Sequence, residues 1–391
     1  MKIDVATRLK KLPPYLFLEI DKAKRKAKQA GKDIIDFGIG DPDQPTPAHV
    51  IKTLSQAAKD PANHRYALDQ GMPALRKEMA SYYKKRFKVN LDPETEILPL
   101  IGSKEGIAHF PLAVLNPGDY SLVPDPCYPP YQRGTILAGA KAYRLPLLEK
   151  NNFLPDLKAV PASITKKAKL IFINYPNNPT AAVASRSFYQ EVLNFARRHK
   201  IIVASDLAYS EISFGAYRPL SFLELKGAKD LAIEFHSLSK TYNMTGWRIG
   251  WACGNKDLVA ALGKVKSNID SGIFSAVQAA GIAAFRNSGQ HIKRMCRIYQ
   301  ERQDVLLKGL NSLGWQVRKP KATFYLWVKI PKSAGKLNSI SFAQKLLSEA
   351  GIVVTPGVGL GKSGEGYIRF ALTIGTKRIK QAIGRLKKLG F

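Results

Sequence analysis

The sequence is poor in cysteine and has no long hydrophobic run. Its three cysteines, Cys127, Cys253 and Cys296, are too few and too widely spaced for a disulfide framework or a zinc cluster. No apolar run approaches the ~20 residues that cross a bilayer, and the N-terminal stretch contains no segment typical of an export signal. We therefore expect a cytoplasmic protein without a bound metal and without a membrane partner.

Acidic residues are also scarce, with 30 Asp and Glu against 61 Lys and Arg and a formal net charge of +31. Such an excess favours phosphate-rich partners such as nucleic acid. The basic residues, however, fall into many short groups, among them 22–28, 84–88, 166–169 and 377–387, mostly within amphipathic helical stretches. We interpret them as solvated helix faces and expect no specific nucleic-acid partner. A basic nucleic-acid-binding regulator built on an enzyme-like domain stays the alternative from another class.

What the sequence does contain is enough apolar material for a large α/β protein. At 391 residues with 45% hydrophobic content, the chain is too long to form only one small hydrophobic core. Short apolar runs at 169–173, 201–204, 231–235 and 248–253 each end in or are bordered by polar or Gly/Pro-rich residues and alternate with helical stretches. This alternation predicts a large domain with a mostly parallel sheet flanked by helices, whose ligand lies beyond the carboxyl ends of the strands.

A second, smaller α+β domain is predicted around a long helix at about 287–310. After this helix, residues 314–331 resemble paired strands, and further helices are expected at 341–350 and 377–389. We assign residues 1–45 and 290–391 to the smaller domain and residues 46–289 to the large one.

The run HSLSKTYNMTGWRIG, residues 236–250, follows a predicted strand and groups Ser237, Ser239, Lys240 and Arg248. A lysine amine forms a Schiff base with an aldehyde cofactor, while hydroxyls and a guanidinium hold its phosphate. A lone lysine is more often a solvated surface charge, so this interpretation needs further support.

Asp206 gives that support, because it ends another apolar strand and a buried carboxylate needs a cationic partner. The ring nitrogen of pyridoxal 5'-phosphate (PLP) is such a partner, and keeping it protonated makes the ring an electron sink. Tyr209 is placed to donate its phenol to the ring oxygen O3'. Helix capping by Asp206 and ordinary packing of Tyr209 are the structural alternatives.

Three other motifs offer anion-binding groups. The segment LIGSKEGIAHF predicts a strand, a turn and a helix start, so the amides of Ser103 and Lys104 face an anion. Asn178 in NYPNNPT is placed to bind O3' and a substrate carboxylate, although such loops are usually only turns. Arg369 in GEGYIRFALT lies among apolar residues, where a bidentate contact to an α-carboxylate or a structural salt bridge would satisfy it.

These motifs occur together and in the order GSKEG, NNPT, SDLAY, SLSK with Arg248 eight residues after the lysine, and YIRFALT. In this combination the chain resembles the fold-type I PLP-dependent aminotransferases related to aspartate aminotransferase, from about residue 13 to residue 389. Within that group it is most similar to the bacterial LL-diaminopimelate aminotransferases.

The resemblance implies a site for each of these residues and adds others. It makes Lys240 the Schiff-base lysine, Asp206 the partner of the ring nitrogen, and Tyr209 and Asn178 the ligands of O3'. The phosphate ligands implied are Ser103, Lys104, Ser237, Ser239, Arg248 and Tyr66, the last supplied by the partner subunit of a homodimer with shared active sites. Tyr128 is implied to stack on the PLP ring, and the implied substrate contacts are Arg369, Gly40, Tyr15, Lys104, Asn178 and Tyr128.

The function implied is transfer of an amino group between LL-diaminopimelate and 2-oxoglutarate, a step of lysine biosynthesis. Aspartate, alanine, aromatic or α-aminoadipate aminotransferases and PLP-dependent β-lyases share the cofactor residues and stay open as alternatives. The chain departs from the family pattern at Ala181, where glycine is usual, and at Val358 and Leu360. We expect the Ala181 loop to adopt a conformation that alanine tolerates, or to be slightly altered.

Overall fold

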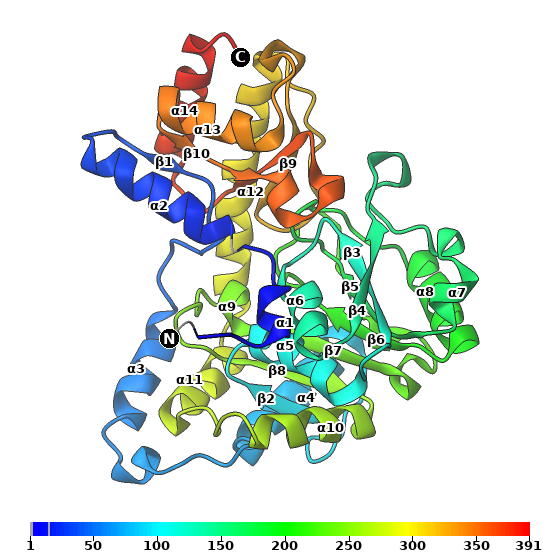
Figure 1. Cartoon of the computed structure of the whole chain (residues 1–391). Helices are drawn as coiled ribbons and strands as arrows, with labels where there is room; N and C mark the ends of the chain where they lie inside the picture. The colour runs from blue at the N-terminus through cyan, green and yellow to red at the C-terminus, as the bar shows by residue number, and fades with distance from the viewer. Residues whose placement is uncertain (1–2, 15) are drawn as a thin grey trace.

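A seven-stranded sheet forms the centre of the computed structural model, which describes residues 3–14 and 16–391 (Figure 1). Its strand order is β2-β8-β7-β6-β5-β3-β4, and β8 alone runs against its neighbours β2 and β7. The strands are β2 (Ile97–Leu100), β3 (Tyr120–Asp125), β4 (Lys141–Pro146), β5 (Ala168–Asn174), β6 (Ile202–Asp206), β7 (Ala232–Ser237) and β8 (Gly250–Gly254). The predicted α/β fold with a mostly parallel sheet is confirmed.

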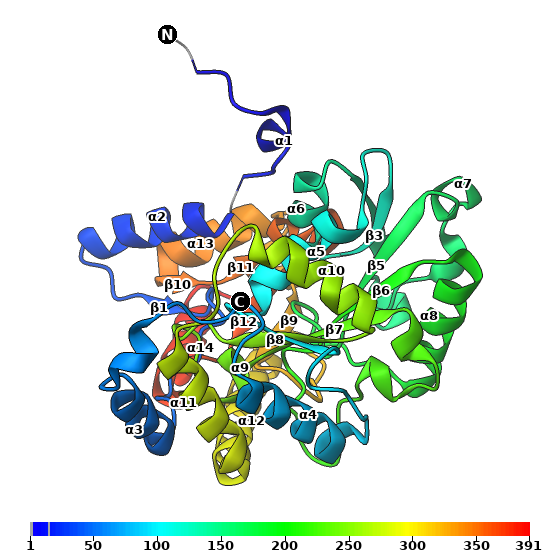
Figure 2. The same cartoon turned by 90° about the horizontal axis from the view of Figure 1, so that it is seen from below.

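Helices cover both faces of this sheet, because its strands are apolar on both sides (Figure 2). On one face, Phe110 and Leu262 from the helices pack with Phe172 and Phe235 from the strands. Helices α5 (Ser103–Val114), α6 (Pro130–Leu137) and α10 (Lys256–Ser267) lie on this face, and α4 (Pro73–Phe87), α8 (Arg186–His199) and α11 (Ser275–Arg286) on the other, with α3 (Ala48–Ala57) against α11.

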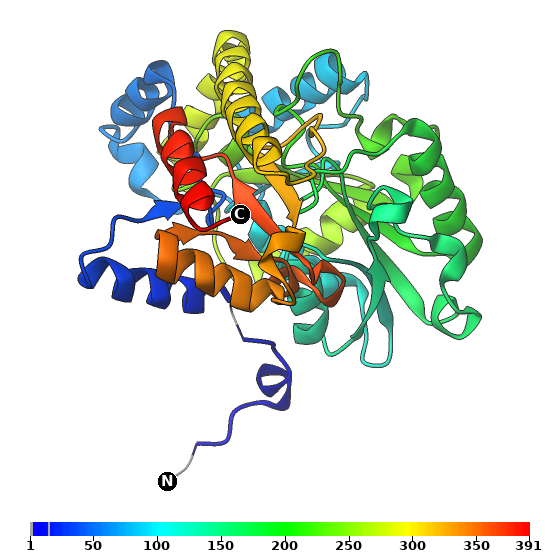
Figure 3. The same cartoon turned by 90° about the horizontal axis from the view of Figure 1, so that it is seen from above.

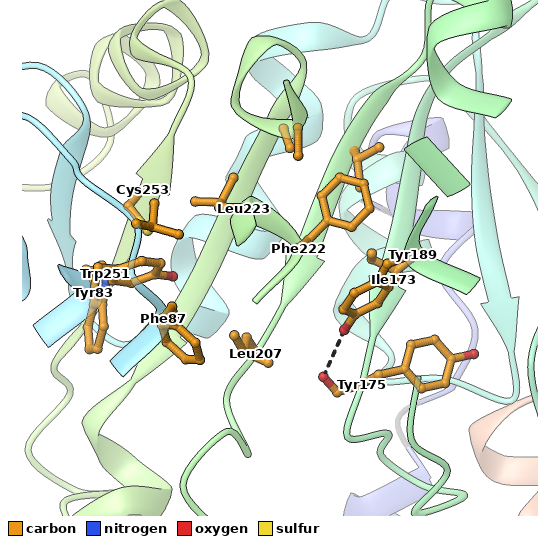
Figure 4. Close-up of a cluster of buried hydrophobic side chains, with 14 of the residues drawn as sticks. Tyr83, Phe87, Ile173, Tyr175, Tyr189, Leu207, Phe222, Leu223, Trp251 and Cys253 are labelled. Carbon is orange, nitrogen blue, oxygen red and sulfur yellow. Dashed lines mark hydrogen bonds between the residues drawn. The ribbon is translucent and has the colours of Figure 1, made fainter. Parts of the chain in front are cut away.

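The core of the second face is rich in aromatic rings, part of which Figure 4 shows. The hydroxyl of Tyr189 in α8 donates to the carbonyl oxygen of Tyr175 at 3.3 Å, so this polar group is satisfied within the core. The labelled neighbours in the figure are Tyr83, Phe87, Ile173, Leu207, Phe222, Leu223, Trp251 and Cys253. This packing fixes the strands that end at the site described below.

A smaller part of the protein is built on two short sheets and a separate core. An antiparallel sheet has the order β11-β12-β9, and β1 pairs in parallel with β10. The elements are β1 (Ile35–Asp36), β9 (Tyr325–Lys329), β10 (Ile352–Val353), β11 (Thr355–Pro356), β12 (Tyr367–Ala371), α2 (Leu16–Gln29), α12 (Gly289–Ser312), α13 (Ser339–Ala350) and α14 (Thr376–Lys388). The three helices predicted after residue 286 are confirmed as α12, α13 and α14. The domain boundaries at 45/46 and 289/290 stay a prediction.

The prediction of paired strands within residues 314–331 is wrong. Only β9 forms there, and its partner is β12, some 40 residues later in the chain. Pro320 has no N–H to donate to a ladder, and Thr323 has a φ of 67°, so the backbone before β9 is not extended enough to pair with it.

The C-terminal helix α14 shows how basic residues are accommodated in one segment. Ile379 and Leu386 are buried, whereas Lys377, Lys380 and Lys387 are exposed, as the amphipathic interpretation predicts for this helix. In Figure 3, α14 lies beside α12 on the outside of the molecule, and the N-terminal segment with α1 (Thr7–Lys10) extends away from it. Within residues 3–14 and 16–391, no helix is long and apolar enough to span a membrane.

Candidate active site

A cavity of about 500 Å³ opens where β5, β6 and β7 end. Asn174 and Asp206, the last residues of β5 and β6, are paired in register, and Ser237 ends β7. The carboxyl ends of parallel strands thus meet at one edge of the sheet, as predicted. The sequence-predicted residues that line the cavity are Gly40, Ser103, Lys104, Tyr128, Asn178, Asp206, Tyr209, Ser237, Ser239, Lys240, Arg248 and Arg369.

Lys240 lies in the short helix α9 (Leu238–Thr241), which follows β7 and directs the ε-amine into the cavity. Nζ donates a hydrogen bond to the carbonyl oxygen of Gly40 at 2.7 Å. Burial lowers the pKa of Lys240 to about 8; Asp41 opposes this shift, and the guanidinium groups of Arg369 and Arg248 add to it. A larger fraction of the amine is therefore neutral, and so nucleophilic, near pH 7 to 8 than for an exposed lysine.

Asp206 is a buried carboxylate with two hydrogen-bond donors. The Tyr131 hydroxyl donates to Oδ2 at 2.7 Å, and the Ala208 N–H donates to Oδ1 at 3.2 Å. Burial raises the pKa of Asp206 to about 6, although the hydrogen bond from Tyr131 opposes this shift. Asn174 holds the strand end by donating to the carbonyl oxygen of Asp206 at 2.8 Å. A carboxylate in this setting is suited to a cationic ligand.

A second side of the cavity gathers groups that bind anions, and we call it the phosphate wall: Ser103, Lys104, Ser237, Ser239 and Arg248. Ser103 is the first residue of α5, whose N-terminal end faces the cavity with Lys104. Gly102 has a φ of 77°, and a Cβ there would lie 2.3 Å from a guanidinium nitrogen of Arg248, so only glycine allows this approach. Likewise, a Cβ on Gly250 would lie 2.7 Å from the amide nitrogen of Ser103.

Arg248 itself precedes β8 with a φ of 56°, outside the strand to which the sequence pattern assigned it. One guanidinium nitrogen donates to the carbonyl oxygen of Thr245 at 2.8 Å. Ser237 caps α9 by accepting the N–H of Ser239 at 3.1 Å. The groups around this wall combine three serine hydroxyls, a helix N-terminus and a guanidinium, which is the donor set of a phosphate site.

Arg369, in β12, projects a buried guanidinium into the cavity from the smaller sheet. It donates to Asn178 Oδ1 at 2.7 Å and to the carbonyl oxygen of Gly38 at 2.9 Å, and it lies 4.4 Å from the ring centre of Tyr325. The Tyr325 hydroxyl is in turn 3.0 Å from that of Tyr209, whose pKa burial raises well above its usual value. Tyr209 thus keeps its proton and can donate it to an anionic oxygen.

The sequence model of the family described as aminotransferase class I and II matches residues 32–386. The chain belongs to this family. It is 54% identical over 386 residues to the LL-diaminopimelate aminotransferase of Syntrophobacter fumaroxidans, with 99% of each chain covered. It is 53% identical to that of Moorella thermoacetica, with 98% of each chain covered.

Solved structures share the whole fold of this chain. Substrate-bound BacF from Bacillus subtilis has a TM-score of 0.95 and 37% identity, covering 100% of this chain and 98% of its own. A mutant of Thermus thermophilus aspartate aminotransferase has a TM-score of 0.92 and 25% identity, covering 99% and 100%. The protein is therefore a PLP-dependent transaminase with the aspartate aminotransferase fold.

The residues present fit PLP. A nucleophilic amine, a buried carboxylate and a phosphate-type donor set border one cavity, and they match the aldehyde, the ring nitrogen and the phosphate of this one molecule. A Cβ at Gly102 would displace the guanidinium of Arg248 from its present position, and the φ of 77° at this residue also favours glycine.

One predicted residue, Tyr66, is not among the residues that line the cavity. Tyr66 is 95% exposed, and its assignment to a partner subunit stays a prediction. Tyr15 lies outside the described residues. Of the departures from the family pattern, Leu360 lines the cavity, whereas Val358 is not among its lining residues.

The expectation that the Ala181 loop adopts a backbone that alanine readily tolerates is wrong, whereas the alternative of a slightly altered loop stays a prediction. Ala181 keeps a left-handed backbone with a φ of 57°, the conformation that favours glycine. Two hydrogen bonds impose it: the N–H of Ala181 donates to the carbonyl oxygen of Asn177 at 3.0 Å, and the N–H of Thr180 donates to the Asn177 side chain at 2.9 Å. The loop shape therefore comes from Asn177 rather than from residue 181.

Sequence reasoning missed several polar residues of the site, among them Asn174, Thr245 and Tyr325, which line the cavity, and Tyr131, which donates to Asp206. Asn174 had a usable signal, because it is the polar end of an apolar strand beside Asp206. Tyr131 and Tyr325 had none, since their contacts join segments 75 and 116 residues apart in the chain.

Proposed function

We propose that this transaminase moves an amino group between LL-diaminopimelate and 2-oxoglutarate, a reaction of lysine biosynthesis. The observation that carries the proposal is the identity of 53 to 54%, over nearly the whole chain, with relatives named for LL-diaminopimelate. The buried guanidinium of Arg369 supports it, because a planar guanidinium is suited to a substrate α-carboxylate.

In this proposal each wall of the cavity holds one part of the cofactor. Asp206 holds the ring nitrogen in its protonated form, while Tyr209 and Asn178 hold the ring oxygen O3'. Tyr128 stacks on the ring. The phosphate is bound by Ser103, Lys104, Ser237, Ser239 and Arg248.

PLP, when bound, supplies a ring that accepts the electron pair left at the substrate Cα when its proton is removed. The chain supplies the base for this step. The Nζ atom of Lys240 would take the Cα proton and deliver it to C4', the carbon of the cofactor aldehyde, and taking the proton requires a neutral amine. Because the pKa of Lys240 is about 8, a substantial fraction of the amine is neutral near pH 7 to 8. Arg369, Gly40, Tyr15 and Lys104 orient the substrate so that the Cα proton faces Nζ.

We also propose a homodimer in which Tyr66 of each subunit reaches the phosphate of the other. The near-complete exposure of Tyr66 supports this, since a phenol on the surface of one subunit is free to enter a partner's site. The division into domains 1–45 with 290–391 and 46–289 belongs to the same proposal. We place the protein in the cytoplasm, where amino-acid biosynthesis supplies its substrates.

A panel of amino donors with 2-oxoglutarate tests the substrate. Purified protein is given LL-diaminopimelate, aspartate, alanine, an aromatic amino acid or α-aminoadipate, and glutamate is measured. We expect LL-diaminopimelate to give the highest kcat/KM. The proposal fails if LL-diaminopimelate does not react while another donor does, and formation of pyruvate with ammonia in place of glutamate would indicate a β-lyase.

The Lys240→Ala variant, purified in parallel, controls for contaminating host aminotransferases. It should show no turnover and should lose the visible absorption of the bound cofactor. An unchanged spectrum would mean that another residue holds PLP.

A further inference from the structure

Lys266, at the end of α10, carries a buried ammonium that the proposed chemistry does not use. Its residue is 0% exposed, and α10 packs against α5, the helix that begins at the phosphate wall. An ammonium removed from water is strongly unfavourable unless anions compensate it. The partners of Lys266 therefore explain why the chain keeps a charge at this depth.

Two carboxylates provide that compensation. Nζ lies 3.5 Å from Glu105 Oε1 and forms a short ion pair with Asp270, and it also donates to the carbonyl oxygen of Ser271 at 3.4 Å. We call Lys266, Glu105 and Asp270 the buried triad. It links the first turn of α5 to the segment that follows α10.

The second oxygen of Glu105 closes the turn at the phosphate wall. Oε2 accepts the N–H of Ile101 at 2.6 Å, so the side chain of residue 105 is bonded back to the backbone of residue 101. Within that span, Ser103 and Lys104 line the cavity. Burial raises the pKa of Glu105 to about 7, and the ammonium of Lys266 opposes this shift. Lys266 thus favours the charged, acceptor-only carboxylate that closes the turn.

The far end of the triad is anchored to the protein body. Two residues after Asp270, a Cβ on Gly272 would lie 2.3 Å from the carbonyl oxygen of Leu68, so the two backbones are in close contact. Displacement of Asp270 is therefore restricted. Because Asp270 is anchored in this way, it limits where the ammonium of Lys266 lies, and Lys266 in turn limits where Glu105 lies.

A metal site is the competing interpretation of this region. Glu105, His109 and Asp270 offer ligand atoms that lie within 4.8 Å of one another. The ammonium of Lys266, however, already pairs with both carboxylates. Lys266 therefore already supplies the positive charge that a metal ion would bring to these carboxylates. This favours a role for Lys266 in positioning Glu105 over a metal site.

We propose that Lys266 is a positioning residue for the cofactor phosphate: by pairing with Glu105 and Asp270 it fixes the turn 101–105 in the shape that presents Ser103 and Lys104 to the cavity. This inference rests on the proposed function, in which Ser103 and Lys104 bind the phosphate.

Comparing PLP with pyridoxal, which lacks the phosphate, isolates this role. The full-length protein is freed of cofactor, and the dissociation constants of PLP and of pyridoxal are measured by absorbance. The measurement is made on the wild type, on Lys266→Met and on Lys264→Met, which is a matched control at an exposed position of the same helix. We expect Lys266→Met to raise the Kd of PLP about tenfold and that of pyridoxal less than about twofold. Lys264→Met should change neither.

Loss of affinity for PLP and pyridoxal by the same factor would mean that Lys266 only supports the fold, and no loss for either would mean that the turn does not depend on it. Both results overturn the proposal. If Lys266→Met does not fold, Glu105→Gln is judged by the same criterion, because glutamine keeps an oxygen for the Ile101 N–H but removes the charge.

The variant Ser103→Ala separates this inference from the function on which it rests. If Ser103→Ala lowers the preference for PLP over pyridoxal and Lys266→Met does not, only the positioning role fails. If neither variant changes that preference, the hydroxyl of Ser103 is not a phosphate ligand, and the positioning role of Lys266 fails as well. The substrate panel is unaffected by either outcome.

Discussion

The carboxylate of Asp206 is expected to destabilise the protein when PLP is removed. Asp206 is 5% exposed, and burial raises its pKa from the usual 3.8 to about 6, although the hydrogen bond from Tyr131 opposes this shift. Each pKa unit corresponds to about 1.4 kcal/mol. The rise from 3.8 to about 6 therefore means that the ionised carboxylate lowers the free energy of unfolding of the apoprotein by about 3 kcal/mol above pH 6. A bound PLP ring with a protonated nitrogen removes this cost by supplying the missing cation.

The substitution Asp206→Asn isolates the charge. Asparagine keeps the size of the side chain, an oxygen for the Ala208 N–H and a polar contact to the Tyr131 oxygen. We expect the free energy of unfolding of the apo variant to exceed that of the apo wild type by about 3 kcal/mol at pH 8. A raised carboxyl pKa gives stability that is full below pH 3.8 and is lost as the pH rises through 6, so the difference should shrink to about half at pH 5.

Urea denaturation of both apo forms at fixed protein concentration, at pH 5, 6.5 and 8, measures the effect. With PLP bound, the order should reverse, and kcat should fall at least about a hundredfold in the variant because the ring nitrogen loses its carboxylate partner. An apo variant no more stable than the wild type at pH 8, or a difference independent of pH, would refute the reasoning about burial.

Three further predictions concern other parts of the site. Arg369→Lys keeps the charge but loses the planar pair of donors, so kcat/KM for the amino donor should fall about 10- to 100-fold in steady-state assays; an unchanged value would place the carboxylate elsewhere. Tyr66→Phe removes one hydroxyl from an exposed position and should raise the Kd of PLP about tenfold in an absorbance titration, with no change in unfolding midpoint. Ala181→Gly relieves a left-handed alanine at a φ of 57° and should raise the free energy of unfolding by about 0.5 to 1 kcal/mol in urea, whereas a loss would show that the alanine methyl has a packing role.

The sequence predicted the chemistry of the strand ends because their signals are local. Asp206, Lys240 and Ser103 each follow an apolar run, and parallel strands bring such positions to one edge without any knowledge of distant contacts. Periodicity also predicted the long helix α12 to within a few residues. These features depend on residue types that lie within one turn or one strand of each other.

Most of the parts that were missed or wrong depend on contacts far apart in the chain, whereas the loop at Ala181 depends on Asn177, four residues earlier. Residues 314–331 have the alternation of a hairpin, yet β9 pairs with β12, because a strand's partner is set by which edge the fold brings near. The hydroxyl of Tyr131 reaches Asp206 from α6, across a sequence separation that no local pattern reports. At Ala181, the residue type indicated one backbone conformation and the hydrogen bonds of Asn177 imposed another.

Lys240 and Asp206 border the same cavity with opposite formal charges, yet each is bonded to a different partner. Nζ of Lys240 donates to the Gly40 carbonyl oxygen, and Asp206 accepts from Tyr131. Burial moves the pKa of both toward the neutral form, to about 8 for the amine and about 6 for the carboxyl. An aldehyde needs the neutral amine, whereas a protonated ring nitrogen needs the ionised carboxylate. A ligand with an aldehyde, a protonated ring nitrogen and a phosphate therefore satisfies all three sets of groups at once, and a ligand without the phosphate does not use the guanidinium of Arg248.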